Sequence, residues 1–487
     1  MAQVIYNSLT AKKEKFVPLK EGEVKLYLCG PTVYDFLHIG NFRGAITFNL
    51  IRNWLEFNNN KVTFVYNYTD VDDKIINRAN EQGVSTKELS EKYIKEFEKD
   101  FNTLGLKKHE HNPRVSDYIP QIIEMIKDIL KNGHGYIIGG EVYFSIESFE
   151  NYGALSKKKL DELEAGQRAE VDVKKKNPFD FVLWKPAKPN EPSWDSPWGK
   201  GRPGWHIECS AMVKSILGES IDIHGGGVDL LFPHHENEIA QSESCNCKKY
   251  ANFWVHNEFI NFGAEKMSKS LGNVITCRNF MEKYNGEILK YLFLSAHYRT
   301  QMSITDDKLL QTISALSRIY SALALADQTI NEVNEEAVLD NGFIKKLESF
   351  DNKIKKALND DFNSAEMISF IFEGVRTFNA LGFKNKKKKN AVHKGCSEAF
   401  KTWMNKYGKM CALFVDDPNT MLSELDQILI QMRDIDKNKV EELVKKRNEH
   451  RENKAWEQAD IIRAELEDMG IELFDGNDKG WRVKVNE

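Results

Sequence analysis

The sequence predicts an α/β fold with a parallel sheet, followed by an α-helical bundle and a small mixed α/β segment at the C-terminus. Residues 24–29 (VKLYLC) have the pattern of a buried strand, residues 42–57 carry helical periodicity, and residues 61–68 form a second apolar strand. A strand–helix–strand unit at this spacing indicates a right-handed parallel crossover, as in Rossmann-like nucleotide-binding sheets. From about residue 306 the chain has long amphipathic stretches with few Gly or Pro, which predicts the helical region.

Residues 116–200 interrupt this pattern and are predicted to form an insertion. They contain the hairpin-like YIIGGEVYFSI, a run of three lysines and a stretch rich in Pro and Trp. Before the insertion, residues 70–82 are predicted to form a helix; after it, the α/β pattern returns in residues 204–212, 220–227 and 250–262. We expect the two halves of the Rossmann-like domain at 1–115 and 201–255, with a connective insertion at 116–200 between them. After them we expect the region around the KMSKS sequence at 256–305, the helical bundle at 306–425 and a C-terminal domain at 426–487.

The composition is that of an ordinary soluble protein. The chain has 487 residues, 41% hydrophobic and 29% charged, which is enough for about three or four domains with a sizeable core. The net charge of −5 gives no overall basic character, so contact with a polyanion must come from local clusters. The polar start argues against a secretory signal, and no run of about 18 apolar residues predicts a membrane helix. Seven scattered cysteines indicate a reducing, cytoplasmic compartment.

The segment FPHHENE, which ends at Glu238, is the strongest candidate metal site. Together with Cys29 and Cys209 it offers the thiolate, imidazole and carboxylate ligands that zinc takes in tetrahedral sites. If the segment is helical, His234 lies four residues from Glu238 and His235 lies three, so both face the carboxylate and helical geometry does not choose between them. The alternative is a solvated helix start, which is the commoner occurrence of such a string.

Two short motifs suit phosphate binding. The HIGN sequence stands at a strand-to-helix turn, where a helix N-terminus offers free N–H groups, Gly40 lets a nucleotide approach and His38 can donate to a phosphate. In KMSKS, Lys266 and Lys269 lie three residues apart in a serine-bearing loop, which suits neutralisation of a triphosphate. Each motif alone is more often an ordinary turn or a solvated basic loop.

HIGN after the first strand and KMSKS after the last form the signature pair of class I aminoacyl-tRNA synthetases. Within that class the chain resembles the cysteinyl-tRNA synthetases along nearly its whole length. The matching stretches are CGPTVYDFLHIGN (29–41), NYTDVDDKI (67–75), SPWGKGRPGWHIECSAM (196–212), HGGGVDLLFPHHENEIAQSE (224–243), EKMSKSLGN (265–273), DDFNSAE (360–366) and WEQADIIRAEL (456–466).

The resemblance implies the activity and its partners. The expected reaction is that of a cysteine–tRNA ligase, which activates L-cysteine with ATP and Mg²⁺ and transfers it to the 3′ end of tRNA(Cys). We expect a monomer with no obligate protein partner and no membrane association. The implied ATP-binding residues are His38, Gly40, Asn41, Lys266, Ser268 and Lys269. Among them, the expected catalytic residues are His38, Asn41, Lys266 and Lys269.

The resemblance also implies one Zn²⁺ per chain and a pocket for cysteine. The implied zinc ligands are Cys29, Cys209, His234 and Glu238, with His235 nearby but unligated. Around the bound cysteine it places Trp205 and Asp229, with Thr69 as a weaker candidate. Because coordination to zinc deprotonates a thiol, the substrate cysteine can bind as a thiolate. The hydroxyl of serine does not ionise comparably, so serine is expected to bind more weakly. Such a site can reject an analogue without hydrolytic editing, and residues 116–200 are too few for a large editing domain.

Basic residues near the C-terminus are candidate tRNA contacts. The resemblance implies that the C-terminal domain binds the anticodon, which favours this function over an ordinary charged helix face. The candidates are Lys445, Lys446, Arg447, Arg451, Trp481 and Arg482. The lysine tract at 384–389 either lies near tRNA or has no role.

Several other clusters have simpler interpretations. The DVDD sequence (70–73) resembles a magnesium site, but capping of the following helix explains it more simply. The CNC sequence (245–247) is more often a pair of unliganded thiols at a surface turn than a metal site. His206, His224 and His256 either surround the metal site or are ordinary core histidines.

Three other functions are considered. A cysteine ligase that charges an amino-sugar is a relative of this fold, but the long helical region and basic C-terminal segment argue against it. A zinc hydrolase is disfavoured because HHENE is not H-E-x-x-H. A non-catalytic RNA-binding descendant does not require intact HIGN and KMSKS, and both are present.

Overall fold

The computed structural model describes residues 2–158, 175–262, 265–266, 275–382, 389–474 and 480–484. The chain folds into two compact units. The first contains residues 1–278, 296–303 and 355–365, and the second contains residues 279–295, 304–354 and 366–487. The finer division into six segments stays a prediction.

A four-stranded parallel sheet forms the centre of the first unit, in the order β10-β9-β3-β4. Its strands are β3 (Glu23–Leu28), β4 (Lys61–Tyr66), β9 (Ile221–Gly227) and β10 (Ala251–Asn257). β9 is buried over most of its length, as expected for a parallel strand covered on both faces. The predicted α/β fold with a parallel sheet is therefore confirmed.

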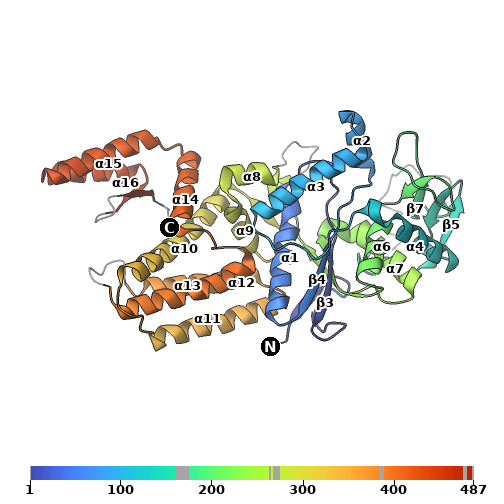
Figure 1. Cartoon of the computed structure of the whole chain (residues 1–487), viewed down its shortest axis with the longest axis horizontal. Helices are drawn as coiled ribbons and strands as arrows, with labels where there is room; N and C mark the ends of the chain where they lie inside the picture. Colours follow the sequence, from blue (N-terminus) through green and yellow to red (C-terminus); the bar gives the residue numbers. More distant parts are fainter. Residues whose placement is uncertain are drawn as a thin grey trace. The chain divides into compact units, whose positions relative to one another are not determined.

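Helix α1 (Ile39–Phe57) connects β3 to β4 and lies alongside them (Figure 1). It begins three residues earlier than its predicted start at residue 42. The HIGN sequence is therefore the cap and first turn of this helix. Apolar residues on several sides of α1, such as Phe42, Phe48 and Trp54, are buried.

The insertion carries its own antiparallel sheet, in the order β5-β6-β7-β8. The hairpin predicted from YIIGGEVYFSI is confirmed as β5 (Gly135–Ile138) and β6 (Glu141–Phe144). The remaining insertion strands are β7 (Phe181–Pro186) and β8 (Gly201–Pro203). The other helices of the first unit up to β10 are α2 (Asp73–Gln82), α3 (Thr86–Thr103), α4 (Ile119–Lys131), α6 (Ile207–Ile216) and α7 (Glu236–Asn246).

The sequence pattern missed an N-terminal hairpin. The hairpin is β1 (Val4–Asn7) paired with β2 (Lys12–Lys15), whose charged residues hide the strand pattern. The α/β pattern expected over residues 250–262 contains two strands, β10 and β11 (Ile260–Phe262). β11 belongs to a different sheet, with β12 (Glu265–Lys266) and β13 (Met302–Ile304).

Arg43 of α1 holds the chain just beyond β10. Its buried guanidinium donates to the carbonyl oxygens of Glu258 and Phe259 at 2.8 Å, and to that of Thr300 at 2.5 Å. These hydrogen bonds tie the segment that follows Asn257 to the start of α1.

We expect Arg43→Ala to lower the free energy of unfolding of the first unit by roughly 3 kcal/mol, because buried carbonyls lose their donors and a cavity remains. Thermal unfolding followed by circular dichroism measures the effect. Arg376→Ala is the matched control, since the Arg376 side chain is 73% exposed and, among the described residues, forms an ion pair only with Glu373 on its own helix. A change below about 0.5 kcal/mol is expected for it. Equal melting temperatures for the two variants would contradict the role of Arg43.

The second unit is helical, which confirms the predicted helical C-terminal region. Its helices are α8 (Cys277–Tyr284), α9 (Gly286–Leu294), α10 (Asp306–Glu332), α11 (Asn341–Asn359), α12 (Ser364–Asn379), α13 (Ala391–Cys411), α14 (Pro418–Met432), α15 (Lys437–Glu452) and α16 (Trp456–Asp468). Three of these helices, α8, α11 and α12, also include a few residues of the first unit. A short hairpin follows, formed by β14 (Ile471–Leu473) and β15 (Trp481–Val483). α10 is long and apolar enough to cross a membrane by length and composition, but 61% of that window is buried, and α10 packs against α13 and α14 as a core helix.

Candidate active site and metal centre

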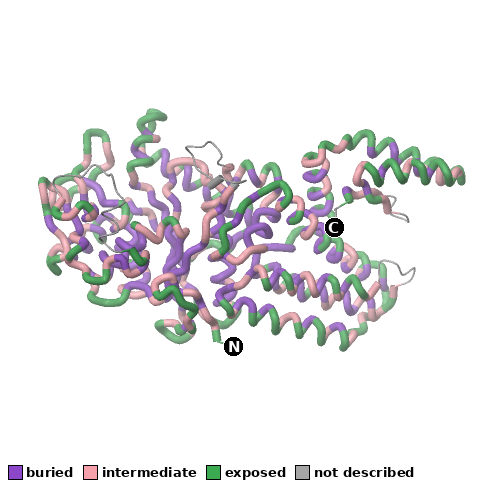
Figure 2. Tube along the Cα trace, turned by 180° about the vertical axis from the view of Figure 1, so that it is seen from behind, coloured by how far each residue is buried: buried purple, intermediate pink, exposed green. Residues whose placement is uncertain are grey.

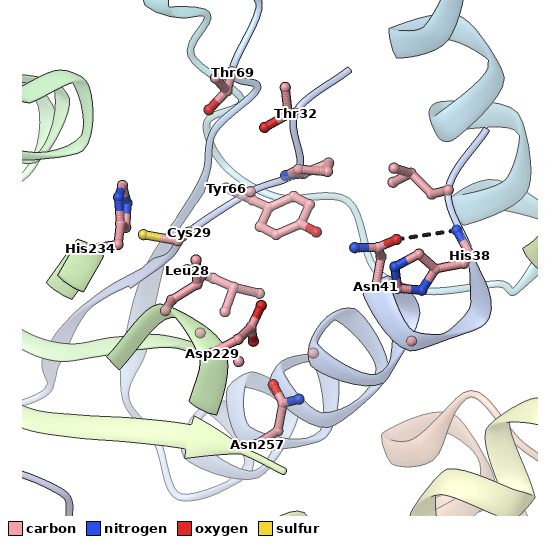
Figure 3. Close-up of a pocket in the computed structure, with 18 of the residues that line it drawn as sticks. Leu28, Cys29, Thr32, His38, Asn41, Tyr66, Thr69, Asp229, His234 and Asn257 are labelled. Atoms are coloured by element: carbon pink, nitrogen blue, oxygen red, sulfur yellow. Dashed lines mark hydrogen bonds between the residues drawn. The ribbon is translucent and has the colours of Figure 1, made fainter. Parts of the chain in front are cut away.

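A pocket of about 420 Å³ opens at the carboxyl ends of the parallel strands, where open α/β sheets bind their ligands. It brings together most of the residues predicted from the sequence, namely Cys29, His38, Gly40, Asn41, Thr69, Trp205, Cys209, Asp229 and His234. Figure 3 shows Cys29 and His234 at one end and His38 and Asn41 at the other, with Tyr66 and Asp229 between them. One cavity therefore joins the candidate metal site to the candidate phosphate site.

At the first end, Cys29, Cys209, His234 and Glu238 form a buried group whose ligand atoms lie within 4.8 Å of one another. The Cys29 and Cys209 sulfurs are 3.8 Å apart, Cys29 Sγ is 3.3 Å from Glu238 Oε1, and His234 Nε2 is 3.1 Å from the same oxygen. A tetrahedral zinc would separate such donors by about 3.8 Å for two sulfurs, about 3.5 Å for sulfur and oxygen, and about 3.3 Å for nitrogen and oxygen. The observed spacing fits a zinc ion.

The protonation of this group also fits a cation. Burial opposes ionisation of Glu238, but charge and hydrogen bonds from His224 and His234 hold its pKa well below the usual range. Burial likewise opposes ionisation of Cys209, but a hydrogen bond from the Cys29 thiol and contact with His234 lower its pKa to about 6. No lysine or arginine in the described part of the chain forms an ion pair with Glu238. The buried anionic donors are thus left to histidines or a metal.

Four separate elements deliver these donors. Cys29 follows β3, and Cys209 lies in the first turn of α6. His234 lies in the irregular turn Leu231–His235, where Phe232 is extended, and Glu238 lies in the first turn of α7. FPHHENE is not one continuous helix, because the backbone of Phe232 is extended, but His234 still lies within 3.1 Å of Glu238.

His235 belongs to an alternative group, with Cys29, His224 and Glu238. However, His235 Nε2 lies 4.0 Å from Glu238 Oε1, farther than His234. Its other nitrogen, Nδ1, lies 2.8 Å from His256 Nε2, and His256 Nδ1 lies 2.8 Å from the Ser8 hydroxyl. This geometry supports His234 as the ligand.

A glycine in β9 explains how His235 fits so deeply. A Cβ on Gly226 would lie 2.6 Å from Cε1 of His235, closer than real side chains approach. Only glycine at this position lets the strand pass the imidazole. The Gly-Gly-Gly sequence in a strand was the signal for such a close approach, and sequence reasoning did not use it.

At the other end of the pocket, His38 caps α1. Its backbone N–H donates to Asn41 Oδ1 at 3.1 Å, the dashed line in Figure 3. The side chain of Asn41 thus fixes the helix start, and the first-turn N–H groups offer the positive end of the helix dipole to an anion. Lys266 lies in β12, whereas Ser268 and Lys269 lie outside the described residues.

The residues predicted to contact cysteine line the space between the two ends. The Trp205 indole is 43% exposed, and its ring centroid lies 4.6 Å from that of His234. Thr69 is buried and donates from its hydroxyl to Glu208 at 3.0 Å, while Asp229 is exposed to the pocket. Sequence reasoning missed Asn257, which ends β10 and lines the same pocket; its signal was a polar residue at the end of a parallel strand.

Glu236 and Asn237 of HHENE form hydrogen bonds with the insertion. Glu236 is fully buried and accepts backbone N–H groups from Gly153 at 3.0 Å and Ser156 at 2.7 Å. Asn237 accepts a hydrogen bond from the Tyr152 hydroxyl at 2.5 Å. The same short segment therefore serves the metal site and the insertion.

The capping interpretation of DVDD agrees with the structure. Asp72 caps α2 by accepting the Lys74 N–H at 2.8 Å, and Asp73 forms an ion pair with Lys185. The surface turn expected for CNC is wrong for Cys245, which is buried in the last turn of α7 beside Lys214; only Cys247 is exposed. The pair joins no metal-binding group among the described residues. The lysine tract lies mostly outside the described residues, and only Lys389 is described.

The candidate tRNA contacts differ in how far they are exposed to solvent. Figure 2 shows α15 and α16 as largely exposed, and Lys445 and Lys446 lie on the exposed side. Arg447 is buried, and Arg482 pairs with Asp426 at 2.8 Å. Arg451 and Trp481 are half-buried. These contacts stay predictions.

Known proteins resemble the chain in sequence and in fold. Residues 15–314 match the family described as tRNA synthetases class I (C) catalytic domain, and residues 353–410 match the DALR domain. A cysteine–tRNA ligase of Bdellovibrio bacteriovorus is 49% identical over 97% of both chains, and one of Geobacter sulfurreducens is 43% identical over 99% of this chain and 100% of that protein.

Solved structures share the fold at low identity. Mycobacterium tuberculosis methionyl-tRNA synthetase in complex with methionyl-adenylate aligns with a TM-score of 0.60 at 12% identity, covering 83% of this chain and 93% of that chain. The LeuRS–tRNA–LeuAMS ternary complex from Agrobacterium radiobacter aligns with a TM-score of 0.60 at 9% identity, covering 84% and 86%. At these identities the likeness concerns the fold alone.

Proposed function

The chain belongs to the cysteinyl-tRNA synthetases, the class I enzymes that join cysteine to its tRNA, and we propose that its buried Cys/Cys/His/Glu group holds the zinc that selects the substrate by its thiol. One observation carries this proposal: a single pocket joins donors at tetrahedral spacing to the capped start of α1. Zinc supplies a Lewis acid that takes sulfur as a thiolate, which serine cannot match.

In the first reaction, the cysteine carboxylate forms a bond to the α-phosphorus of ATP, and the bond to the leaving pyrophosphate breaks. We assign the phosphates to the α1 N-terminus with His38, Gly40 and Asn41, and we assign their neutralisation to Mg²⁺ and the KMSKS residues Lys266, Ser268 and Lys269. Asp229 is suited to the substrate ammonium group, since it is a carboxylate in the same pocket. Catalysis then comes mainly from positioning and electrostatic stabilisation.

In the second reaction, the 2′-hydroxyl of the terminal adenosine attacks the activated carbonyl group, and AMP leaves. The exposed Lys445 and Lys446 on α15 are the best-placed of the proposed tRNA contacts, because neither is buried. Family membership also supports a monomer in the cytoplasm. Light scattering of the purified protein tests the oligomeric state.

Cysteine-dependent ATP–pyrophosphate exchange tests the proposal. We expect exchange with cysteine, none above background with serine, transfer of cysteine to tRNA, and a zinc content near one per chain by elemental analysis. Treatment with a strong chelator should reduce exchange by at least about 100-fold, and added zinc should restore it, because the metal binds the substrate directly.

Each failure of this assay has its own meaning. Exchange without transfer to tRNA would favour the ligase that charges an amino-sugar. No exchange by zinc-replete protein would exclude both ligases. Full activity after verified zinc removal would leave the ligase intact but would reject zinc as the group that binds the thiol.

A further inference from the structure

The two oxygens of Glu238 have separate sets of neighbours. Oε1 faces the candidate ligands, 3.1 Å from His234 Nε2 and 3.3 Å from Cys29 Sγ. Oε2 points the other way and accepts two hydrogen bonds, from the Tyr250 hydroxyl at 2.9 Å and from His224 Nε2 at 2.9 Å. Because Glu238 and His224 are fully buried and Tyr250 is 1% exposed, water does not compete for Oε2.

Both donors are held rigidly by the sheet. His224 lies in β9, and its ring stacks on that of Trp254 with centroids 4.4 Å apart. Tyr250 precedes β10; its carbonyl accepts the Ile221 N–H at 2.9 Å, and its own N–H donates to Glu243 at 3.1 Å. These contacts fix the ring of His224 and the backbone of Tyr250 beside Glu238.

His224 uses only one of its nitrogens. Its Nδ1 is buried and has no hydrogen-bond partner among the described residues, so its bond to Glu238 is its one polar contact. A buried imidazole with a single polar contact costs stability compared with an apolar residue. Because His224 lowers stability in this way, we infer that its hydrogen bond to Glu238 serves the function of the site.

We propose that Tyr250 and His224 are positioning residues of the metal centre, which tie down Oε2 of Glu238 so that Oε1 alone faces the ion. The inference rests on the proposed function, since it assumes that Glu238 is a ligand. A carboxylate with both oxygens free can bind a cation through one or two of them. Restricting Glu238 to one oxygen keeps the protein at four donor atoms and leaves room for the sulfur of the substrate.

Outer groups of this kind typically change metal affinity by about 10- to 100-fold. We therefore expect Tyr250→Phe, which removes a single oxygen atom, to raise the zinc dissociation constant by roughly that factor. Competition with a chromophoric chelator on the full chain measures this constant. The visible absorption of the cobalt(II)-substituted protein should also change in intensity, because it depends on the number and geometry of donor atoms.

Tyr320→Phe is the matched control. Tyr320 is also fully buried and donates to a buried glutamate, Glu287, at 2.7 Å, but this pair lies in the second unit. Loss of this bond costs stability of the same kind, yet it should leave zinc affinity and the cobalt spectrum unchanged. A purely structural role of Tyr250 predicts that both variants behave alike.

Substitutions of His224 provide a second test that does not depend on the folding of Tyr250→Phe. The amide of His224→Gln can still donate to Oε2, whereas His224→Ala cannot. We expect His224→Ala to weaken zinc binding by about 10- to 100-fold and His224→Gln to recover most of that loss. Wild-type zinc affinity and cobalt spectra in Tyr250→Phe and His224→Ala would overturn the inference.

Failure of the inference is distinguishable from failure of the proposed function. If the wild-type chain binds no zinc at this site or does not activate cysteine, the proposed function fails. If the wild-type chain does both, and Tyr250→Phe binds zinc equally well, only the positioning role fails.

Discussion

Cys209→Ser is expected to reduce kcat/KM for cysteine in ATP–pyrophosphate exchange by about 1,000-fold or more, because a direct metal ligand should matter more than the outer groups that are worth about 10- to 100-fold. Cys209 lies 3.8 Å from the Cys29 sulfur, and Cys29 lies at the opposite end of the pocket from His38 (Figure 3). The dissociation constant for ATP should therefore stay within about threefold of wild type. Exchange kinetics and ATP titration by calorimetry measure the two effects.

Cys396→Ser is the control for this prediction. Cys396 is also a buried thiol, but it lies in α13 of the second unit, so a general effect of a buried hydroxyl would appear there too. If Cys209→Ser loses ATP binding and cysteine activation equally, zinc is not the receptor for the substrate thiol.

His38→Ala should lower kcat of exchange by about 100- to 1,000-fold, the usual loss when one preorganised donor to a developing charge is removed. Zinc content should remain near that of the wild type, because His38 lies at the opposite end of the pocket from Cys29 and His234 (Figure 3). Steady-state exchange kinetics and elemental analysis on the same preparation give both quantities.

His111→Ala is the comparison for His38→Ala, since His111 is exposed and does not line the pocket. It should keep both activity and zinc. If His38→Ala retains wild-type kcat and raises only KM for ATP, His38 binds the ground state and does not stabilise the transition state.

The parallel core was predictable because its signals are local. The apolar runs of β3 and β4 follow from the burial of parallel strands on both faces of the sheet. The apolar residues of α1 follow the helical repeat. The β1–β2 hairpin was not predictable in this way, because its second strand is Lys-Lys-Glu-Lys. The hydrogen bonds from Arg43 to the chain after β10 join residues more than two hundred positions apart in sequence, so no local pattern contained them.

The candidate site could be predicted only in part, because some of its contacts join residues far apart in the sequence. The family motifs point to Cys29, Cys209, His234 and Glu238, but helical spacing alone does not choose between His234 and His235. The distances of the two imidazoles from Glu238 come only from the structure. The role inferred for Tyr250 had no signal in the sequence at all. A tyrosine after a Lys-Lys pair has no distinguishing pattern until folding places its hydroxyl beside Glu238.

The hydrogen bonds that Glu236 accepts from the insertion bear on how this enzyme could be shortened by evolution or by engineering. Glu236 is fully buried, and the backbone of the insertion supplies its donors. Deleting the insertion would leave that carboxylate without partners two residues before Glu238, and buried carboxylates without partners destabilise their surroundings. A minimal version of the catalytic domain would therefore need a compensating change at position 236.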